Sequence, residues 1–216
     1  MKTLASETSI RDFLTAVASA EEAHGAVSSA AVAAGIGISL LAMVAGLPKT
    51  RSDSADERME LLTAAAGLND VQEQLIETIE TETAVKIFAA RKMPQASETE
   101  RTERRDAIQL ALRAAADVPL EVMRLCARGL KLGHTVAVHG VRAAAADVQL
   151  GVALLQAAFS GAQTNLERKQ TNLERKLSSL TDTLYITSVV DEIARLSEEA
   201  TAATRAAESI VRRPQA

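Results

Sequence analysis

The chain has 216 residues, enough for one domain whose core needs neither disulfides nor metal ions. A net charge of -4 and an aromatic content of 2% argue against nucleic-acid binding, which usually needs a basic face with stacking aromatic side chains. The single cysteine, Cys126, excludes an intrachain disulfide and indicates a reducing compartment. Since the first residues also lack the apolar core of a secretory signal, we expect a cytoplasmic protein.

The first predicted element is a short amphipathic helix. Ser9 is suited to cap its N-terminus, because a serine hydroxyl accepts a hydrogen bond from the first helical turn. Ile10, Phe13, Leu14 and Val17 then follow at helical spacing and form one apolar face.

The next segment, residues 26–47, is uncharged and long enough to cross a bilayer. It is rich in Ala, Gly and Ser, it has no aromatic belt, and its flanking cations, Lys49 and Arg51, stand at one end only. These features favour a helix that is buried and wrapped by other helices. A membrane-anchored helical protein is the alternative.

Two helical regions follow. Apolar residues recur at helical spacing over 57–92, with a weak interruption at 67–69, and predict a long helix that is kinked there. Pro94 and the polar residues after it are expected to form a linker, and a helix resumes over 103–116. Pro119 is then expected to start or kink the next helix, which runs to Gly133.

The last two helices each carry one apolar stripe. The stripe of the helix from about residue 141 comprises Val148, Val152, Leu155, Phe159 and Ala162. The final helix is expected to begin near Asp182 as its N-cap. Its apolar side comprises Ile186, Val190, Ile193, Ala200 and Ile210. With no alternating strand pattern, the sequence predicts an all-α multi-helix bundle and a single domain over 1–216.

A tandem repeat lies between these two helices. Residues 164–170 read TNLERKQ and residues 171–177 read TNLERKL. Because seven residues are almost two helical turns, an insertion of this length lengthens a helix by about 10.5 Å and rotates later residues by only ~20°. We interpret the repeat as a tandem duplication, with a two-heptad coiled coil as the alternative.

Several motifs in this order resemble one enzyme family. The Ala-rich helix ends in Met-Val-Ala at 43–45. Residues 105–109 contain an arginine and an isoleucine-glutamine pair, and residues 117–120 contain valine-proline-leucine. Asp147 opens the next long helix, and residues 161–165 place Gly-Ala before an asparagine. From residue 10 to 182 the chain is similar to the formiminotetrahydrofolate cyclodeaminases and the related methenyltetrahydrofolate cyclohydrolases.

The resemblance implies a helical homodimer with a tetrahydrofolate derivative as substrate. The first function implied by the resemblance is hydrolysis of 5,10-methenyltetrahydrofolate to 10-formyltetrahydrofolate in one-carbon metabolism. The nearest alternative is formiminotetrahydrofolate cyclodeaminase, in which N10 attacks the formimino carbon and ammonia leaves. A non-catalytic paralogue that binds folate, or serves as a scaffold, is the alternative from another class. Folate and a second copy are thus the expected partners, without nucleic acid or membrane.

The resemblance also implies a catalytic carboxylate. Family members carry an aspartate about fourteen residues before a proline, and counting back from Pro94 gives Glu80 as the general base. A glutamate is one methylene longer than the aspartate of the family, so activity itself is in question. On spacing alone, Glu77, Glu80 and Glu82 also fit a solvated acidic helix face.

The substrate-binding positions implied by the resemblance are Gly25, Ser28, Lys49, Arg51, Asp147, Asn165 and Asn172. The chain departs from the family pattern near several of them. Gly25 is all that remains of a glycine-rich turn, Pro48 replaces a threonine, and Lys176 replaces a second asparagine. Lys49 and Arg51 also fit a simpler role, the neutralisation of a helix C-terminus.

No metal is expected. His134 and His139 are five residues apart, which differs from the i, i+4 spacing that places two ligands on one helical face. The sequence also contains no GxGxxG, P-loop or GxSxG motif, so nucleotide-dependent and serine-hydrolase chemistry have no support.

Overall fold

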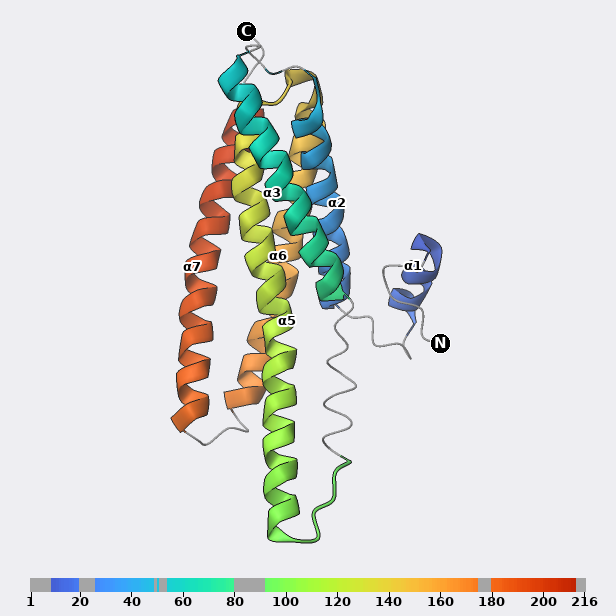
Figure 1. Cartoon of the computed structure of the whole chain (residues 1–216), viewed down its shortest axis with the longest axis vertical. Coiled ribbons are helices and arrows are strands. Elements are labelled where there is room, and N and C mark those ends of the chain that lie inside the picture. Colours follow the sequence, from blue (N-terminus) through green and yellow to red (C-terminus); the bar gives the residue numbers. More distant parts are fainter. Residues whose placement is uncertain are drawn as a thin grey trace.

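The structure is a computed structural model that describes residues 9–19, 26–48, 50, 54–79, 92–174 and 180–212, with backbone alone at 79, 168–174 and 180–182. Within these residues it is entirely helical and contains no strand, which confirms the predicted all-α class (Figure 1). The helices are α1 (Ile10–Ala18), α2 (Ala26–Gly46), α3 (Ala55–Ile79), α5 (Glu98–His139), the 3-10 helix η2 (Arg142–Ala144), α6 (Ala145–Glu174) and α7 (Leu180–Val211).

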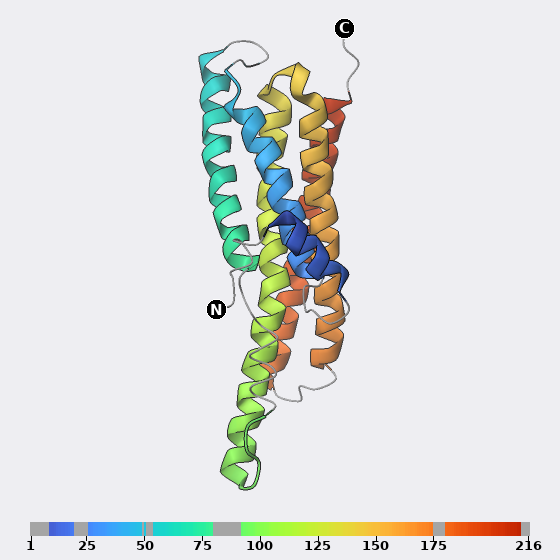
Figure 2. The same ribbon diagram turned by 90° about the vertical axis from the view of Figure 1, so that its right-hand side faces the viewer.

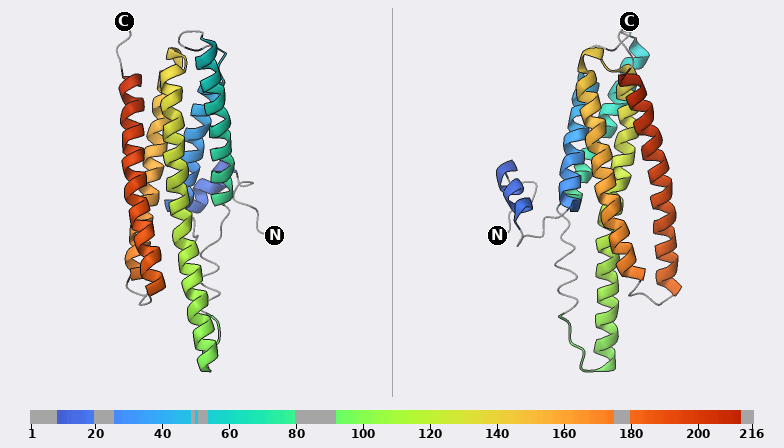
Figure 3. Two further views of the ribbon diagram at one scale, coloured as in Figure 1. Left: turned by 60° about the vertical axis from the view of Figure 1, so that its left-hand side comes forward. Right: turned by 180° about the vertical axis from the view of Figure 1, so that it is seen from behind.

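The long helices α2, α3, α5, α6 and α7 run side by side in an elongated bundle (Figures 1 and 2). Helix α2 packs on α3, α5 and α6, and α7 packs on α5 and α6. The N-terminal part of α5 extends beyond the other helices (Figures 1 and 3). Helix α1 lies apart from the bundle, and none of its residues is buried. Ser9 caps α1 as predicted.

The core is built on a close antiparallel contact between α2 and α6. A Cβ added at Gly37 would lie 2.7 Å from the carbonyl oxygen of Gly151, and a Cβ added at Gly151 would lie 2.9 Å from the carbonyl oxygen of Gly37. Neither position therefore has room for a side chain, so the two backbones approach each other directly. Ile38 and Leu155, both fully buried, fill the space beside this contact against Gly129 of α5.

Helix α2 is buried on one face only, which corrects the prediction of a helix wrapped on all sides. Its buried residues are Ala30, Ala31, Ala34, Gly37, Ile38, Leu41, Val44 and Ala45. On the opposite face Ile36 is 52% exposed and Met43 is 48% exposed. By length and apolar composition, Ala26–Gly46 and Arg142–Glu167 each suffice to cross a membrane. In the described part of the chain both segments pack within the bundle.

Helix α5 corrects two predicted boundaries. It is one continuous helix that begins at Glu98, because Ser97 and Glu100 form a capping box: each side chain accepts a hydrogen bond from the other residue's backbone N–H. Pro119 lies inside the helix and is buried, so it does not start a helix, and the alternative of a kink stays a prediction. Gly133, the predicted end, is also internal, where its missing side chain leaves room for Leu41 of α2.

The remaining elements confirm most of the predicted pattern. Helix α3 is uninterrupted at 67–69, because Leu68 is fully buried and Gly67 packs against Leu132; the predicted kink is wrong. The predicted continuation over 80–91 lies outside the described residues.

All five residues of the α6 stripe are buried. The helix remains continuous to Glu174, so residues 164–174 of the tandem repeat are helical. The insertion itself stays a prediction.

The buried face of α7 is rotated about the helix axis relative to the predicted apolar stripe, because α7 packs on α5 and α6 together. Its buried residues are Val189, Ile193, Leu196, Ala200 and Ala207, whereas Val190 is 40% exposed. The helix begins at Leu180, so Asp182 lies inside it and the predicted cap is wrong. The buried Cys126 of α5 contacts the core as a small apolar side chain, and burial raises the pKa of its thiol to about 12.

Charged side chains join α5 to α7 along their length. The Arg124 guanidinium donates to both carboxylate oxygens of Glu192, at 2.8 and 2.7 Å, and the Lys131 ammonium lies 2.5 Å from Glu199. These hydrogen bonds lower the pKa of both glutamates. The Tyr185 hydroxyl donates to Asp117 at 2.8 Å. The Arg124–Glu192 pair is bidentate, and several charged groups form a network with it. Partly exposed ion pairs contribute to stability in this arrangement.

The glycine contact predicts a position-specific cost for a single methyl group. Gly37→Ala and Gly151→Ala each force the α2 and α6 backbones apart, so each is expected to lower the free energy of unfolding by about 2–3 kcal/mol. The matched controls are Gly35→Ala, where nothing lies within 4 Å, and Gly161→Ala, where Ala30 Cβ lies at an ordinary 3.8 Å. These two should be neutral or stabilising, since alanine favours helix. Urea unfolding followed by circular dichroism measures all four, and equal stability of Gly37→Ala and Gly35→Ala would contradict the contact.

Candidate functional site

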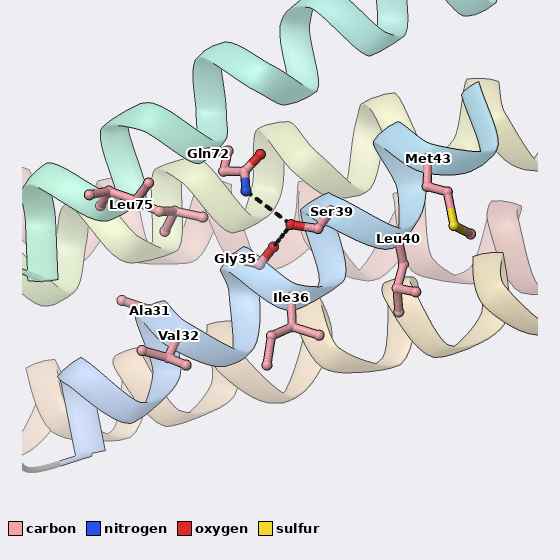
Figure 4. Close-up of a pocket in the computed structure, with 10 residues that line it drawn as sticks. Ala31, Val32, Gly35, Ile36, Ser39, Leu40, Met43, Gln72 and Leu75 are labelled. Carbon is pink, nitrogen blue, oxygen red and sulfur yellow. Dashed lines mark hydrogen bonds between the residues drawn. The ribbon is translucent and has the colours of Figure 1, made fainter. Parts of the chain in front are cut away.

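An open groove of about 480 Å³ runs between α2 and α3 (Figure 4). Apolar side chains dominate its surface, and its rim includes the exposed residues Ile36, Met43 and Ile76. Its full lining is Ala31, Val32, Gly35, Ile36, Ser39, Leu40, Met43, Gln72, Leu75 and Ile76. The groove exists because α2 buries only one face against α6, which leaves the other face open beside α3. Its volume lies in the range of small-molecule sites.

Two polar side chains meet in this apolar groove. The Gln72 side-chain amide of α3 donates to the Ser39 hydroxyl of α2 at 3.0 Å, and Ser39 donates to the Gly35 carbonyl at 2.9 Å (Figure 4). The remaining amide oxygen of Gln72 is an acceptor that a bound molecule can use. A planar ring with polar edges fits such a surface, because its faces need apolar contact and its edges need hydrogen bonds. Sequence analysis missed both residues; their only signal is that Ser39 interrupts an apolar helix.

Several predicted site residues fall outside the described part of the chain. These are Gly25, Lys49, Arg51 and Glu80, together with the side chain of Asn172. Ser28, Asp147 and Asn165 are described, and each is partly buried.

Ser28 lies at the N-terminal end of the groove. It precedes Val32 by one helical turn, so the two side chains share a face of α2, and Val32 lines the groove. On the other wall Ile76 lines the same end, close to Ile79, where the described part of α3 ends. Glu80 is the next residue in the chain. The groove end near Ser28 is therefore the end at which the predicted base follows α3 in the sequence.

Asp147 is not brought together with Ser28. Because α2 and α6 are antiparallel, Gly37 faces Gly151 and Ala30 lies beside Gly161. Asn165, one turn beyond Gly161, consequently lies near the N-terminal end of α2, whereas Asp147 lies near its C-terminal end. Asp147 and Asn165 are eighteen positions apart, which corresponds to about 27 Å along α6. Within one chain the sequence-predicted residues thus divide between two ends of the bundle.

Asn165 is unusual among these residues. Its side-chain carbonyl oxygen is buried and has no hydrogen-bond partner within the described part of the chain. An unpaired buried acceptor is costly, so such a group in a native protein calls for an explanation. One explanation is a bound ligand that donates a hydrogen bond to this oxygen, which agrees with the predicted role of Asn165 in substrate binding.

The C-terminus of α2 is neutralised by a residue that sequence analysis missed. Arg58, on the first turns of α3, donates to the Ala45 carbonyl oxygen at 3.3 Å and to the Leu47 carbonyl oxygen. The same role was considered for Lys49 and Arg51, which lie outside the described residues, so for them it stays a prediction. No sequence signal marks Arg58, because the contact depends on how α3 turns back onto α2.

The predicted absence of a metal site is not tested by the structure. Among the described residues no group of three or more His, Cys, Asp or Glu side chains is arranged to hold a metal ion. His139 instead pairs with α3, with its Nε2 2.9 Å from Glu60.

In its described residues, the protein is a helical bundle with an apolar groove between α2 and α3. A sequence profile of the formiminotransferase-cyclodeaminase family matches residues 9–195. The chain belongs to this family.

Two named relatives are similar to the chain in sequence. Formimidoyltransferase-cyclodeaminase of Gallus gallus is 28% identical over 196 residues, which cover 87% of this chain and 34% of that protein. Methenyltetrahydrofolate cyclohydrolase of Methylorubrum extorquens is 29% identical over 157 residues, which cover 71% of this chain and 74% of that protein. The chain thus spans about a third of the chicken protein and about three quarters of the bacterial one.

The fold is also that of a solved structure. The crystal structure of formiminotetrahydrofolate cyclodeaminase from Thermotoga maritima matches with a TM-score of 0.79 and 19% identity. The match covers 95% of this chain and 96% of that one. At this identity the likeness shows the fold.

The unpaired oxygen of Asn165 predicts that one substitution raises stability and weakens ligand binding. Asn165→Leu, which has nearly the same shape, removes the buried acceptor and is expected to raise the free energy of unfolding by about 1 kcal/mol. If the oxygen serves a ligand, the same variant binds folate more weakly. Thermal unfolding and folate titration measure the two effects. A destabilised variant would show instead that Asn165 makes a stabilising contact in the protein.

Proposed function

We propose that this protein is a methenyltetrahydrofolate cyclohydrolase, which hydrolyses 5,10-methenyltetrahydrofolate to 10-formyltetrahydrofolate. The observation that carries the proposal is the groove between α2 and α3, which has an apolar surface and a Ser39 and Gln72 polar pair. Ser28 lies one helical turn before Val32, which lines one end of the groove. The bacterial relative with this name supports the proposal, because it matches the chain along most of its own length. The pterin is proposed to lie in the groove, with its reactive carbon near Ser28.

The chemistry requires one general base. Water adds to the cationic carbon that bridges N5 and N10, and the base accepts a proton from that water. The bond between this carbon and N5 then breaks, the hydroxyl group of the adduct gives up its proton to become the carbonyl, and N5 takes up a proton, which leaves a formyl group on N10. Glu80 is the proposed base, since a carboxylate also stabilises the cationic bridge before attack. The apolar groove assists because a surface that excludes water strengthens this charge interaction.

A second candidate activity is formiminotetrahydrofolate cyclodeamination. It is favoured by the name of the chicken relative and by the likeness in fold to the Thermotoga enzyme. Both reactions form or open the same one-carbon bridge, so the same groove and base serve either. Release of ammonia from formiminotetrahydrofolate distinguishes the cyclodeaminase, and loss of methenyl absorbance distinguishes the cyclohydrolase. Tight folate binding with neither reaction would identify a non-catalytic paralogue.

We further propose that the enzyme is a cytosolic homodimer in which residues 1–216 form one domain. The support is the separation of Asp147 from the Ser28 end of the groove by about 27 Å, which is most of the length of α2. In an antiparallel dimer, the two ends of the bundle lie next to each other, because a two-fold axis places the top of one copy beside the bottom of the other. Asp147 of one copy is then able to act on folate held in the groove of the partner.

The proposed base predicts a selective loss of turnover. Glu80→Gln removes the carboxylate with little change in shape and is expected to lower kcat for methenyltetrahydrofolate at least about 100-fold. Glu77→Gln, at an exposed position of the same acidic segment, is the matched control and should keep the activity. The decay of methenyl absorbance measures both. Equal activity of the two variants would support the solvated acidic face and remove Glu80 from the mechanism.

The proposed dimer predicts complementation between two inactive variants. Glu80→Gln and Asp147→Asn, each inactive alone, form mixed dimers that carry one intact site and one doubly altered site. Random reassortment should therefore restore about a quarter of the wild-type activity. Light scattering on the same samples reports the mass of the particle. A monomeric enzyme, or a mixture as inactive as its components, would contradict a site shared between copies.

A further inference from the structure

The orientation of one side-chain amide in the groove is fixed by a short chain of hydrogen bonds. The Ser39 hydroxyl has a single proton and donates it to the Gly35 carbonyl oxygen at 2.9 Å, because a carbonyl has no proton to donate in return. Ser39 therefore accepts from Gln72, at 3.0 Å. The amide nitrogen of Gln72 must face Ser39, and its oxygen is turned away from Ser39 (Figure 4). Without this contact, rotation about the last side-chain bond would exchange the two ends of the amide.

The fixed amide leaves one donor and one acceptor for a ligand. Gln72 lines the groove, and in the described part of the chain its side-chain oxygen and its second amide N–H have no other hydrogen-bond partner. Apolar side chains flank the polar pair, since Ile76 follows Gln72 by one turn of α3 and Ile36 precedes Ser39 by one turn of α2. The surface thus offers apolar contact to the faces of a ring and an ordered donor and acceptor to its edge.

We propose that Gln72 is the specificity-determining residue for the pterin and reads its cyclic amide. The Gln72 oxygen accepts from the N–H at N3, and the Gln72 N–H donates to the oxygen on C4. Ser39 is a positioning residue that acts through Gln72. This inference rests on the proposed function, which places the pterin in the groove, and it adds which edge of the ring the protein recognises.

The fixed order of donor and acceptor determines which rings are rejected. A pteridine with an amino group on C4 has an acceptor at N3 and a donor at C4, which reverses the order found in a pterin. Against Gln72 it would place acceptor beside acceptor and donor beside donor. Rotation of the amide would relieve both clashes, but it would turn the amide oxygen toward Ser39, whose proton is held by Gly35. A site rejects a ligand that leaves its polar groups unpaired.

A matched pair of ligands tests this order. Tetrahydrofolate and tetrahydroaminopterin differ only in the oxygen or amino group on C4, so the ratio of their dissociation constants isolates one edge of the ring. Because the groove is open to water, the wild-type protein is expected to bind tetrahydrofolate only about tenfold more tightly. Isothermal titration calorimetry under anaerobic conditions measures both dissociation constants without any need for turnover.

Two substitutions at Ser39 separate positioning from mere support of the helices. Ser39→Ala leaves the Gln72 amide able to rotate, so the ratio is expected to fall toward one, chiefly through tighter binding of tetrahydroaminopterin. Ser39→Thr keeps a hydroxyl that bonds the carbonyl one turn earlier, so it should retain the wild-type ratio. Ser39 is exposed, so both variants are expected to fold. Thermal unfolding followed by circular dichroism reports any change in stability separately from the ratio.

Ser197→Ala is the matched control. Ser197 of α7 donates to the Ile193 carbonyl oxygen at 2.7 Å, which is the same bond to the preceding turn, and it does not line the groove. Its removal should leave the ratio unchanged. Gln72→Leu removes the donor and the acceptor together, and it should weaken tetrahydrofolate binding about tenfold and abolish the preference.

The outcomes separate this inference from the proposed function. A wild-type ratio near one, or a ratio that Ser39→Ala leaves unchanged, would overturn the reading of the cyclic amide and leave the proposed function standing. The expected ratios without hydrolysis of methenyltetrahydrofolate would refute the proposed function alone. Binding of neither ligand would overturn both, since the groove would then not be a pterin site.

Discussion

The bundle depends on one contact, the approach of α2 to α6 at Gly37 and Gly151. Because each glycine faces the carbonyl oxygen of the other, the two backbones lie closer than any side chain would allow. That approach fixes which face of α2 is buried, and Ile38, Leu41 and Leu155 fill the space around it. The open face of α2 follows from the same contact, and with it the groove. The fold and the candidate site are therefore two results of a single packing constraint.

The groove joins an apolar surface to few polar groups, a combination that suits a flat heterocycle better than a strongly charged ligand. Ser39 and Gln72 are paired with each other across the α2 and α3 boundary, so they hold the two walls together while they offer hydrogen bonds to a ligand. Charges concentrate elsewhere, along α5 and α7, where Arg124 and Lys131 lower the pKa of their glutamate partners. This division separates the stabilising electrostatics from the proposed site.

The predicted site residues lie at two ends of the bundle because they come from long helices that pack antiparallel. A sequence motif places a residue on a helix, but it does not show which end of that helix lies beside which end of its neighbour. Ser28 and Asn165 lie near one end of the α2 and α6 pair because the helices are antiparallel, and Asp147 lies near the other end for the same reason. A second copy related by a two-fold axis is the simplest way to reunite them, and it is the arrangement that we propose.

The sequence by itself determined the helical class, the family, the cap at Ser9 and the apolar stripe of α6, because these depend on local spacing and on short motifs. A helix start at Pro119 and a helix end at Gly133 are both wrong, since tertiary packing keeps α5 continuous through these two residues. Only the tertiary structure decided the groove, the pairing of Ser39 with Gln72 and the role of Arg58. Each joins residues from separate helices, and periodicity along one helix carries no information on how two helices are placed against each other.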